Sequence, residues 1–200
     1  MIVTGFPRSG TTLLYCMLRY AVEGYQFLDH ESWAPRPGHI LKSVRAVFEA
    51  PAELIRGALV MVRDPREILC SVYHFGPYHD QPYVSAHSTL KWKDRGLCEW
   101  WAAIKMIQDA HLIRYEDLVA DPCKVQLELA DRFEYRPGRY FDEFHLESHG
   151  EMWEGAMNGR RAPAHSRKLD IARLEEQFRL YPELHDVCAE MGYGGHRAAA

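Results

Sequence analysis

A glycine-bounded loop near the start of the chain has the residue types of an anion-binding site. Gly5 and Gly10 are separated by four residues, and the loop between them carries one cation, Arg8. Two glycines leave room for backbone N–H groups to close on a phosphate, and the hydroxyls of Thr11 and Thr12 can add donors. The alternative is a glycine turn that simply opens a helix.

The glycine spacing matches the nucleotide-binding pattern G-x-x-x-x-G-K-[ST] except at one position. Thr11 replaces the lysine that normally reaches the β- and γ-phosphates of a triphosphate. A cation inside the loop, as Arg8 is, would stand beside a group attached to a 5′ phosphate. The loop chemistry therefore differs from that of an ordinary ATP site.

The segment from Pro7 to Thr12, with the sequence Pro-Arg-Ser-Gly-Thr-Thr, resembles the 5′-phosphosulfate loop of a known enzyme family. These are the sulfotransferases that use 3′-phosphoadenosine 5′-phosphosulfate (PAPS), whose pattern is P-[KR]-S-G-T-T. The resemblance implies PAPS as donor and 3′,5′-diphosphoadenosine (PAP) as product. It assigns five residues to donor binding: Arg8, Ser9, Gly10, Thr11 and Thr12.

A second pair of residues fits the 3′-phosphate site of this family, an arginine at a strand end and a serine eight residues later. Arg63 and Ser71 reproduce that spacing. A strand end followed by about two helical turns can place both side chains on one face, where a guanidinium and a hydroxyl would hold a phosphate. Alternatively, Arg63 pairs with a surface carboxylate and Ser71 is a bystander.

Two further segments resemble the family more loosely. Tyr115 opens a Tyr-Glu-Asp-Leu segment and would lie near the adenine, or its ring would pack under the sheet. Arg160 and Arg161 stand where the family has an Arg-Lys-Gly-x-x-Gly loop over the 3′ phosphate, although Ala162 and His165 replace the glycines. Those two arginines either contact the phosphate or are solvated.

Sulfuryl transfer also needs positive charge at the leaving oxygen and a base for the acceptor proton. Arg8 is the candidate for the first role. Some members of the family use a histidine after the third strand, which is missing here, and others use a glutamate shortly after the first helix. Glu31 is found close to that place and is the candidate base, with His30 as second choice. Both could instead be loop residues outside the site. The reaction needs no metal, and the histidines lack zinc-ligand spacing with cysteines.

The elements that must position these residues alternate between strands and helices. Apolar runs and turn residues predict strands at 1–4, 25–28 (buried), 39–44, 58–62 and 110–114. Helices are predicted at 10–22, around 44–50 or 51–55, from Asp64-Pro65 to about 76, and at 92–107, 121–133, 169–178 and 182–191. The pattern predicts one α/β domain over 1–200, a three-layer α/β/α fold with a mainly parallel sheet of the P-loop type.

Composition narrows the class of protein further. The net charge of −4 argues against general nucleic-acid binding, and no run of eighteen apolar residues suggests a membrane span. The five cysteines are scattered and form no Cys-x-x-Cys pair, which favours reduced thiols and a cytoplasmic location.

The sequence thus predicts a cytoplasmic sulfotransferase that acts on a small-molecule, carbohydrate or peptide acceptor. A P-loop kinase or NTPase is the first alternative, against which the missing loop lysine counts. A non-catalytic nucleotide-binding or interaction module on the same fold is the second.

Overall fold

Four stretches of the chain are described by the computed structural model, residues 1–28, 37–73, 96–144 and 171–194. The chain divides into two units, which are treated separately below. The first unit comprises Met1–Val62 with Ile107–Asn158, and the second comprises Arg63–Met106 with Gly159–Ala200.

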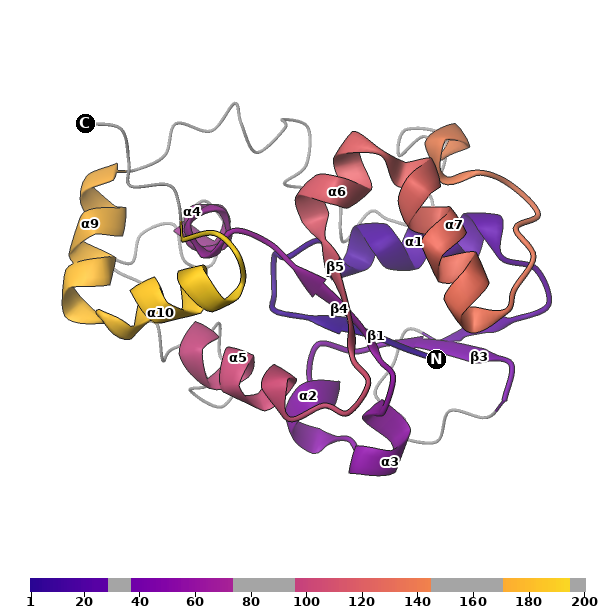
Figure 1. The fold of residues 1–200 in the computed structure, drawn as a ribbon, viewed down its shortest axis with the longest axis horizontal. Helices are drawn as coiled ribbons and strands as arrows, with labels where there is room; N and C mark the ends of the chain where they lie inside the picture. The colour runs from indigo at the N-terminus through magenta and orange to yellow at the C-terminus, as the bar shows by residue number, and fades with distance from the viewer. Residues whose placement is uncertain (29–36, 74–95, 145–170, 195–200) are drawn as a thin grey trace. The chain divides into compact units, whose positions relative to one another are not determined.

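The first unit is built on a five-stranded sheet with the strand order β2-β3-β1-β4-β5 (Figure 1). Every neighbouring pair of strands runs parallel. The strands are β1 (Ile2–Gly5), β2 (Gln26–Leu28), β3 (His39–Lys42), β4 (Leu59–Val62) and β5 (His111–Arg114). All residues of β1 and β4 are buried, as expected for central parallel strands.

Helices cover both faces of this sheet. The helices are α1 (Thr11–Ala21), α2 (Ala46–Glu49), α3 (Ala52–Ile55), α6 (Tyr115–Ala120) and α7 (Pro122–Phe133). Figure 1 shows α1, α6 and α7 on one side of the strands and α2 and α3 on the other. One buried apolar cluster joins Leu14 and Leu18 of α1 to Val3, Ile113 and Leu129. The predicted three-layer α/β/α fold with a parallel sheet is therefore confirmed.

Local sequence signals explain where several of these helices begin and end. The Asp121 carboxylate accepts from the backbone N–H of Lys124 at 3.0 Å, which caps α7 ahead of Pro122. Pro51 separates α2 from α3, because the residue before a proline avoids helical geometry and Ala50 is extended with ψ 143°.

One strand prediction needs correction. The segment 25–28 was expected to be buried, but Gln26 is exposed and Phe27 and Leu28 are only partly buried. The reason is topological: β2 is at the edge of the sheet and pairs only with β3 among the described strands. Its apolar side chains reach the core from the sheet margin, as in the edge-to-face contact of Phe27 with Tyr15, whose ring centroids are 5.6 Å apart.

A buried amide fixes the segment that follows α7. The side chain of Gln126 is fully buried; its Nε2 donates to the carbonyl of Arg139 at 2.7 Å. Its Oε1 accepts from the backbone N–H of Phe141 at 2.9 Å. Phe141 opens the short 3₁₀ helix η2 (Phe141–Glu143) and is itself fully buried. Gln126 therefore holds the segment from Arg139 to Phe141 against α7 and the apolar core.

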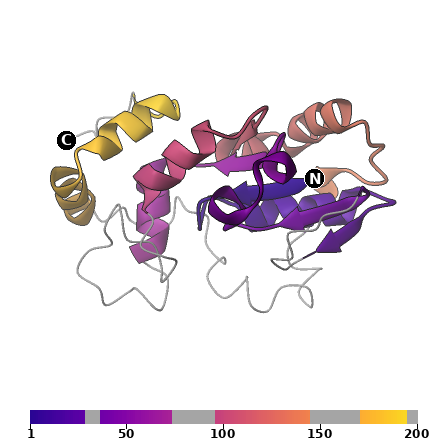
Figure 2. The same ribbon diagram turned by 90° about the horizontal axis from the view of Figure 1, so that it is seen from below.

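The second unit contains helices α4 (Pro65–Tyr73), α5 (Leu97–Lys105), α9 (Ile171–Leu180) and α10 (Glu183–Glu190). Figures 1 and 2 both show α10 between α9 and α5. The Glu190 carboxylate accepts from Nε1 of Trp101 at 2.7 Å and from Nζ of Lys105 at 2.6 Å, which joins α10 to α5. Helices α5, α9 and α10 overlap the segments predicted at 92–107, 169–178 and 182–191, and the predicted starts at 92 and 169 lie outside the described residues.

Candidate functional site

The loop between β1 and α1 closes tightly at the carboxyl end of a central strand. The backbone N–H of Ser9 donates to the carbonyl of Phe6 at 3.0 Å, and that of Leu14 donates to the carbonyl of Gly10 at 3.2 Å. Arg8 and Gly10 both have left-handed backbone, with φ values of 74° and 100°. This conformation costs a non-glycine residue roughly 1–2 kcal/mol and tends to occur at functional sites. Turns of this kind form anion-binding concavities.

Gly5 is required because two hydroxyl groups occupy the space of a side chain. A Cβ on Gly5 would lie 2.5 Å from Oγ1 of Thr11 and 2.6 Å from Oγ of Ser9. Those two hydroxyls are hydrogen-bonded at 3.2 Å, and both residues are buried. One oxygen of the pair donates and the other accepts, so the accepting hydroxyl still has a hydrogen to donate. Thr12, by contrast, is partly exposed.

Tyr115 lies against the second glycine of the loop. A Cβ on Gly10 would lie 2.5 Å from Cδ2 of Tyr115 and 3.4 Å from Cε of Met61. Tyr115 is the first residue of α6 and follows the end of β5, so the end of a distant strand reaches the loop. Its ring also packs on the apolar core, as one of the two interpretations of the sequence expected. The predicted contact of Tyr115 with an adenine stays a prediction.

Two cations at the carboxyl ends of the strands were not predicted from the sequence as site residues. Lys42 ends β3 and Arg114 ends β5, and the carboxyl ends of parallel strands are where ligands bind in open α/β sheets. The Nζ of Lys42 lies 5.7 Å from the ring centroid of Tyr15 on α1. The signal that could have identified both residues is their position at the last residue of a predicted strand.

In the second unit, Arg63 and Ser71 are both buried, with 7% and 8% of their surface exposed. Arg63 lies two residues before the first residue of α4, and Ser71 lies within the helix. The Nη2 of Arg63 is 3.2 Å from Oε2 of Glu67 and forms an ion pair with it. The carboxylate partner that the second interpretation of Arg63 required is therefore Glu67, one helical turn along.

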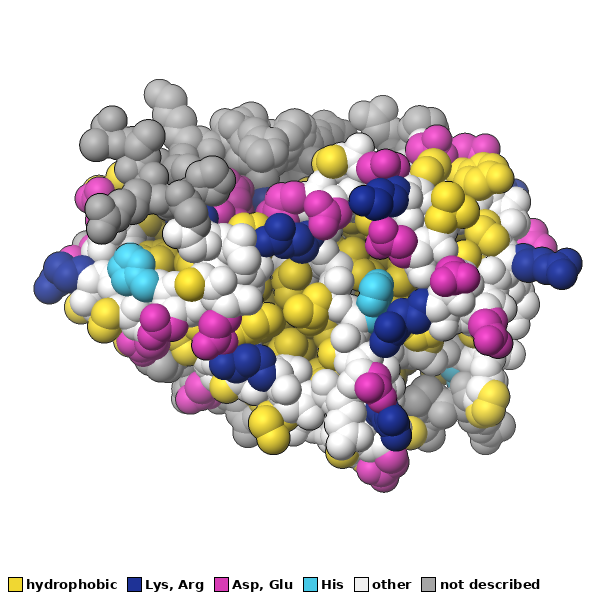
Figure 3. Space-filling model, in the orientation of Figure 1, with side chains coloured by type: hydrophobic (Ala, Val, Ile, Leu, Met, Phe, Trp, Pro, Cys, Tyr) yellow, Lys and Arg dark blue, Asp and Glu magenta, His cyan; other side chains and the backbone are white. Residues whose placement is uncertain are grey.

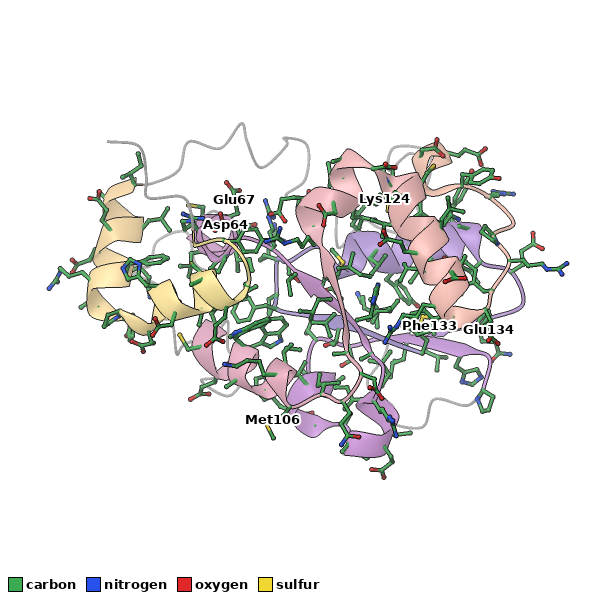
Figure 4. The ribbon with its side chains drawn as sticks, viewed as in Figure 1. Asp64, Glu67, Met106, Lys124, Phe133 and Glu134 are labelled. Atoms are coloured by element: carbon green, nitrogen blue, oxygen red, sulfur yellow. The ribbon has the colours of Figure 1, made fainter. Side chains whose placement is uncertain are left out.

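The start of α4 is fixed by a second ion pair. Oδ1 of Asp64 accepts from the backbone N–H of Arg66 at 2.9 Å, which is the predicted helix cap. Both carboxylate oxygens also accept from the Arg66 guanidinium, at 2.8 and 2.7 Å, and this contact raises the pKa of Arg66. Arg66 donates in addition to the carbonyl of Tyr193 at 3.0 Å. Asp64 and Glu67 both lie at the N-terminal end of α4 (Figure 4).

The remaining predicted site residues lie outside the described residues. They are Glu31, His30, Arg160 and Arg161. Their roles as base and as phosphate ligands therefore stay predictions. Within the four described stretches, no three His, Cys, Asp or Glu side chains are grouped as a metal site would need. Nor is any helix there both long enough and apolar enough to cross a bilayer.

Comparison with known proteins is informative at the level of structure. No protein-family model matches the sequence, and no curated protein matches it. Among solved structures, the chain is similar to mouse sulfotransferase SULT7A1 complexed with PAP. The match has a TM-score of 0.55 and 15% sequence identity, and it covers 98% of this chain and 85% of the mouse chain. The chain has a sulfotransferase fold.

The sulfotransferase fold gives the sequence pattern its structural context. In this chain the pattern Pro-Arg-Ser-Gly-Thr-Thr follows a central parallel strand and ends in the first turn of α1, as in a P-loop protein. The loop between β1 and α1, Tyr115 and the strand-end cations Lys42 and Arg114 all belong to the first unit. Arg63, Glu67 and Ser71 all belong to the second.

Proposed function

We propose that this protein is a sulfotransferase that moves a sulfuryl group from PAPS to a hydroxyl or amine of an acceptor and releases PAP. The observation that carries the proposal is the loop between β1 and α1. Its glycines are enforced by neighbouring side chains, it holds Arg8 in a left-handed conformation, and it lacks the lysine of an ATP site. The sulfotransferase fold supports the same conclusion.

The residues present fit a 5′-phosphosulfate group. Backbone N–H groups of the loop, the start of α1 and the hydroxyl of Thr12 would donate to its oxygens. As the bond between sulfur and the 5′-phosphate oxygen breaks, negative charge grows on that oxygen. Arg8 would stabilise this charge electrostatically, because a guanidinium stays protonated and is a poor proton donor.

The acceptor requires a base. The new bond forms between the acceptor oxygen or nitrogen and sulfur, in line with the bond that breaks, and the acceptor proton is transferred to the base. Glu31 is the proposed base and His30 the alternative. Arg63 and Ser71 would bind the 3′ phosphate, with Arg160 or Arg161 as further contacts, and Tyr115 would lie near the adenine.

The proposal extends to the location of the enzyme and the class of its acceptor. The scattered cysteines favour a cytoplasmic enzyme, and its acceptor would be a small molecule, a carbohydrate or a peptide. Nucleic acid is not a proposed partner, because the net charge is −4. On the face shown in Figure 3, Lys and Arg side chains lie interspersed with Asp and Glu side chains. The mechanism requires no metal ion.

Ligand-induced thermal stabilisation tests the proposal against its main alternative. PAP should raise the melting temperature, because a ligand at 100 times its dissociation constant stabilises a protein by about 2.7 kcal/mol. ATP with Mg²⁺ should raise it much less. Stabilisation by ATP with Mg²⁺ but not by PAP would instead identify a P-loop kinase or NTPase.

Transfer activity is the second test. The protein should move ³⁵S label from PAPS to some member of a panel of hydroxyl and amine acceptors. The Arg8→Ala variant should transfer no label, and full activity of that variant would refute the role of Arg8. Tight PAP binding without transfer to any acceptor would favour the non-catalytic nucleotide-binding module.

A further inference from the structure

The ion pair between Arg63 and Glu67 involves Nη2 of the guanidinium that the proposed function assigns to the 3′ phosphate. The two residues are four apart, and their closest atoms, Nη2 and Oε2, are 3.2 Å from each other. The Arg63 side chain is 8% exposed, whereas the Glu67 side chain is 22% exposed. The carboxylate is therefore on the more open side of the pair.

This pair is looser than comparable pairs in the same chain. Arg45 and Glu49 have the same spacing, and their Nη2–Oε1 distance is 2.8 Å. Next to Arg63, the Asp64 carboxylate is bound by both the Nε and the Nη2 of Arg66. Asp64 is thus committed to fixing the start of α4, while Glu67 makes a long contact to Arg63.

We propose that Glu67 is an internal competitor for the 3′-phosphate of the nucleotide, so that the carboxylate leaves Arg63 when the phosphate binds. This inference rests on the proposed function. A phosphate monoester carries up to two charges and three oxygens and can bind a guanidinium through two hydrogen bonds. It should therefore displace the Glu67 carboxylate from its 3.2 Å contact with Nη2.

Displacing Glu67 from Arg63 makes the binding free energy less favourable only for nucleotides that carry a 3′ phosphate. A nucleotide with a 3′ phosphate competes with Glu67 for the Arg63 guanidinium and places its charge near a carboxylate, which weakens binding. A nucleotide without a 3′ phosphate does neither. Glu67 accordingly lowers the affinity for PAP and speeds its release after transfer, and it leaves binding through the 5′ end unaffected.

The Glu67→Gln variant tests this, with binding measured by calorimetry on the full chain and dissociation by stopped flow. PAP should bind about three to ten times more tightly, as expected when a competing ion pair and a like-charge contact are removed. Most of the gain should be in slower dissociation. Adenosine 5′-monophosphate, which differs from PAP by the 3′ phosphate alone, should bind as it does to the unchanged protein.

Two further variants distinguish the loss of the Glu67–Arg63 contact from a change in the net charge of the protein. Glu49→Gln is the matched control, because Glu49 pairs with an arginine at the same spacing and is also 22% exposed. It changes the net charge equally and should leave the affinity for PAP unchanged. Glu67→Asp keeps the charge but shortens the side chain, so PAP affinity should rise by less than in Glu67→Gln.

Several results would overturn the inference. Weaker PAP binding by Glu67→Gln would mean that the carboxylate holds Arg63 in position for the phosphate. Equal tightening by Glu49→Gln, or tighter binding of adenosine 5′-monophosphate, would mean that only the overall charge matters. Failure of the unchanged protein to bind PAP at all would refute the proposed function itself, and the inference with it. Urea unfolding of each variant identifies any loss of folding.

Discussion

Replacing Gly10 by alanine tests how the loop is built, and the structure allows the effect to be divided into two parts. The first part is backbone strain, because Gly10 has φ of 100°. A left-handed conformation costs alanine about 1 kcal/mol relative to glycine. The second part is a steric conflict, because the new Cβ would lie 2.5 Å from Cδ2 of Tyr115. That is about 1 Å closer than carbon atoms normally approach.

Gly24 supplies a control for the first part alone. Its φ is 80°, and a Cβ there would meet no atom within 4 Å. Gly24→Ala should therefore lower the free energy of unfolding by about 1 kcal/mol. Gly10→Ala should lower it by about 2–4 kcal/mol, since overpacking typically adds 1–3 kcal/mol to the strain.

Urea unfolding followed by circular dichroism measures both variants, and calorimetry measures PAP binding. Gly10→Ala should also weaken PAP binding, because the loop or the Tyr115 ring must move, whereas Gly24→Ala should not. In a Tyr115→Ala background, Gly10→Ala should lower the free energy of unfolding by only about 1 kcal/mol, because the backbone strain remains and the steric conflict is removed. The reasoning fails if Gly10→Ala and Gly24→Ala destabilise the protein equally.

Three other predictions concern the proposed chemistry and the fold. Arg63→Ala should weaken PAP binding by about 2–3 kcal/mol as a charged hydrogen bond is lost; calorimetry showing an unchanged affinity would remove Arg63 from the site. Glu31→Gln should reduce the rate of sulfuryl transfer without changing PAP affinity, and if His30→Ala does so instead, His30 is the base. Gln126→Leu should lower the free energy of unfolding by about 2–3 kcal/mol, because it leaves the Arg139 carbonyl and the Phe141 N–H without their amide partner. Urea unfolding tests this, and an effect below about 0.5 kcal/mol, the size typical of surface changes, would contradict it.

Most of the helices and strands could be predicted because short-range signals specify them. The apolar run at Leu59–Val62 forms a buried central strand, and Asp64 and Asp121 cap the helices that follow them. The prediction was wrong for burial at 25–28, because the same apolar pattern suits a central strand and the inner side of an edge strand. Strand order decides between the two, and no local signal specifies that order.

The sequence alone determined the loop, its glycines and its missing lysine, since all of these lie within eight consecutive residues. It also contained the Arg63–Glu67 spacing, which is local to one helical turn. The tertiary structure alone decided that Tyr115 lies against Gly10, that Ser9 and Thr11 fill the space over Gly5, and which strand ends meet at the loop. Such contacts join residues far apart in the chain or depend on the course of a turn. They exist only when the parallel strands and their helices are packed together, so no local sequence pattern specifies them.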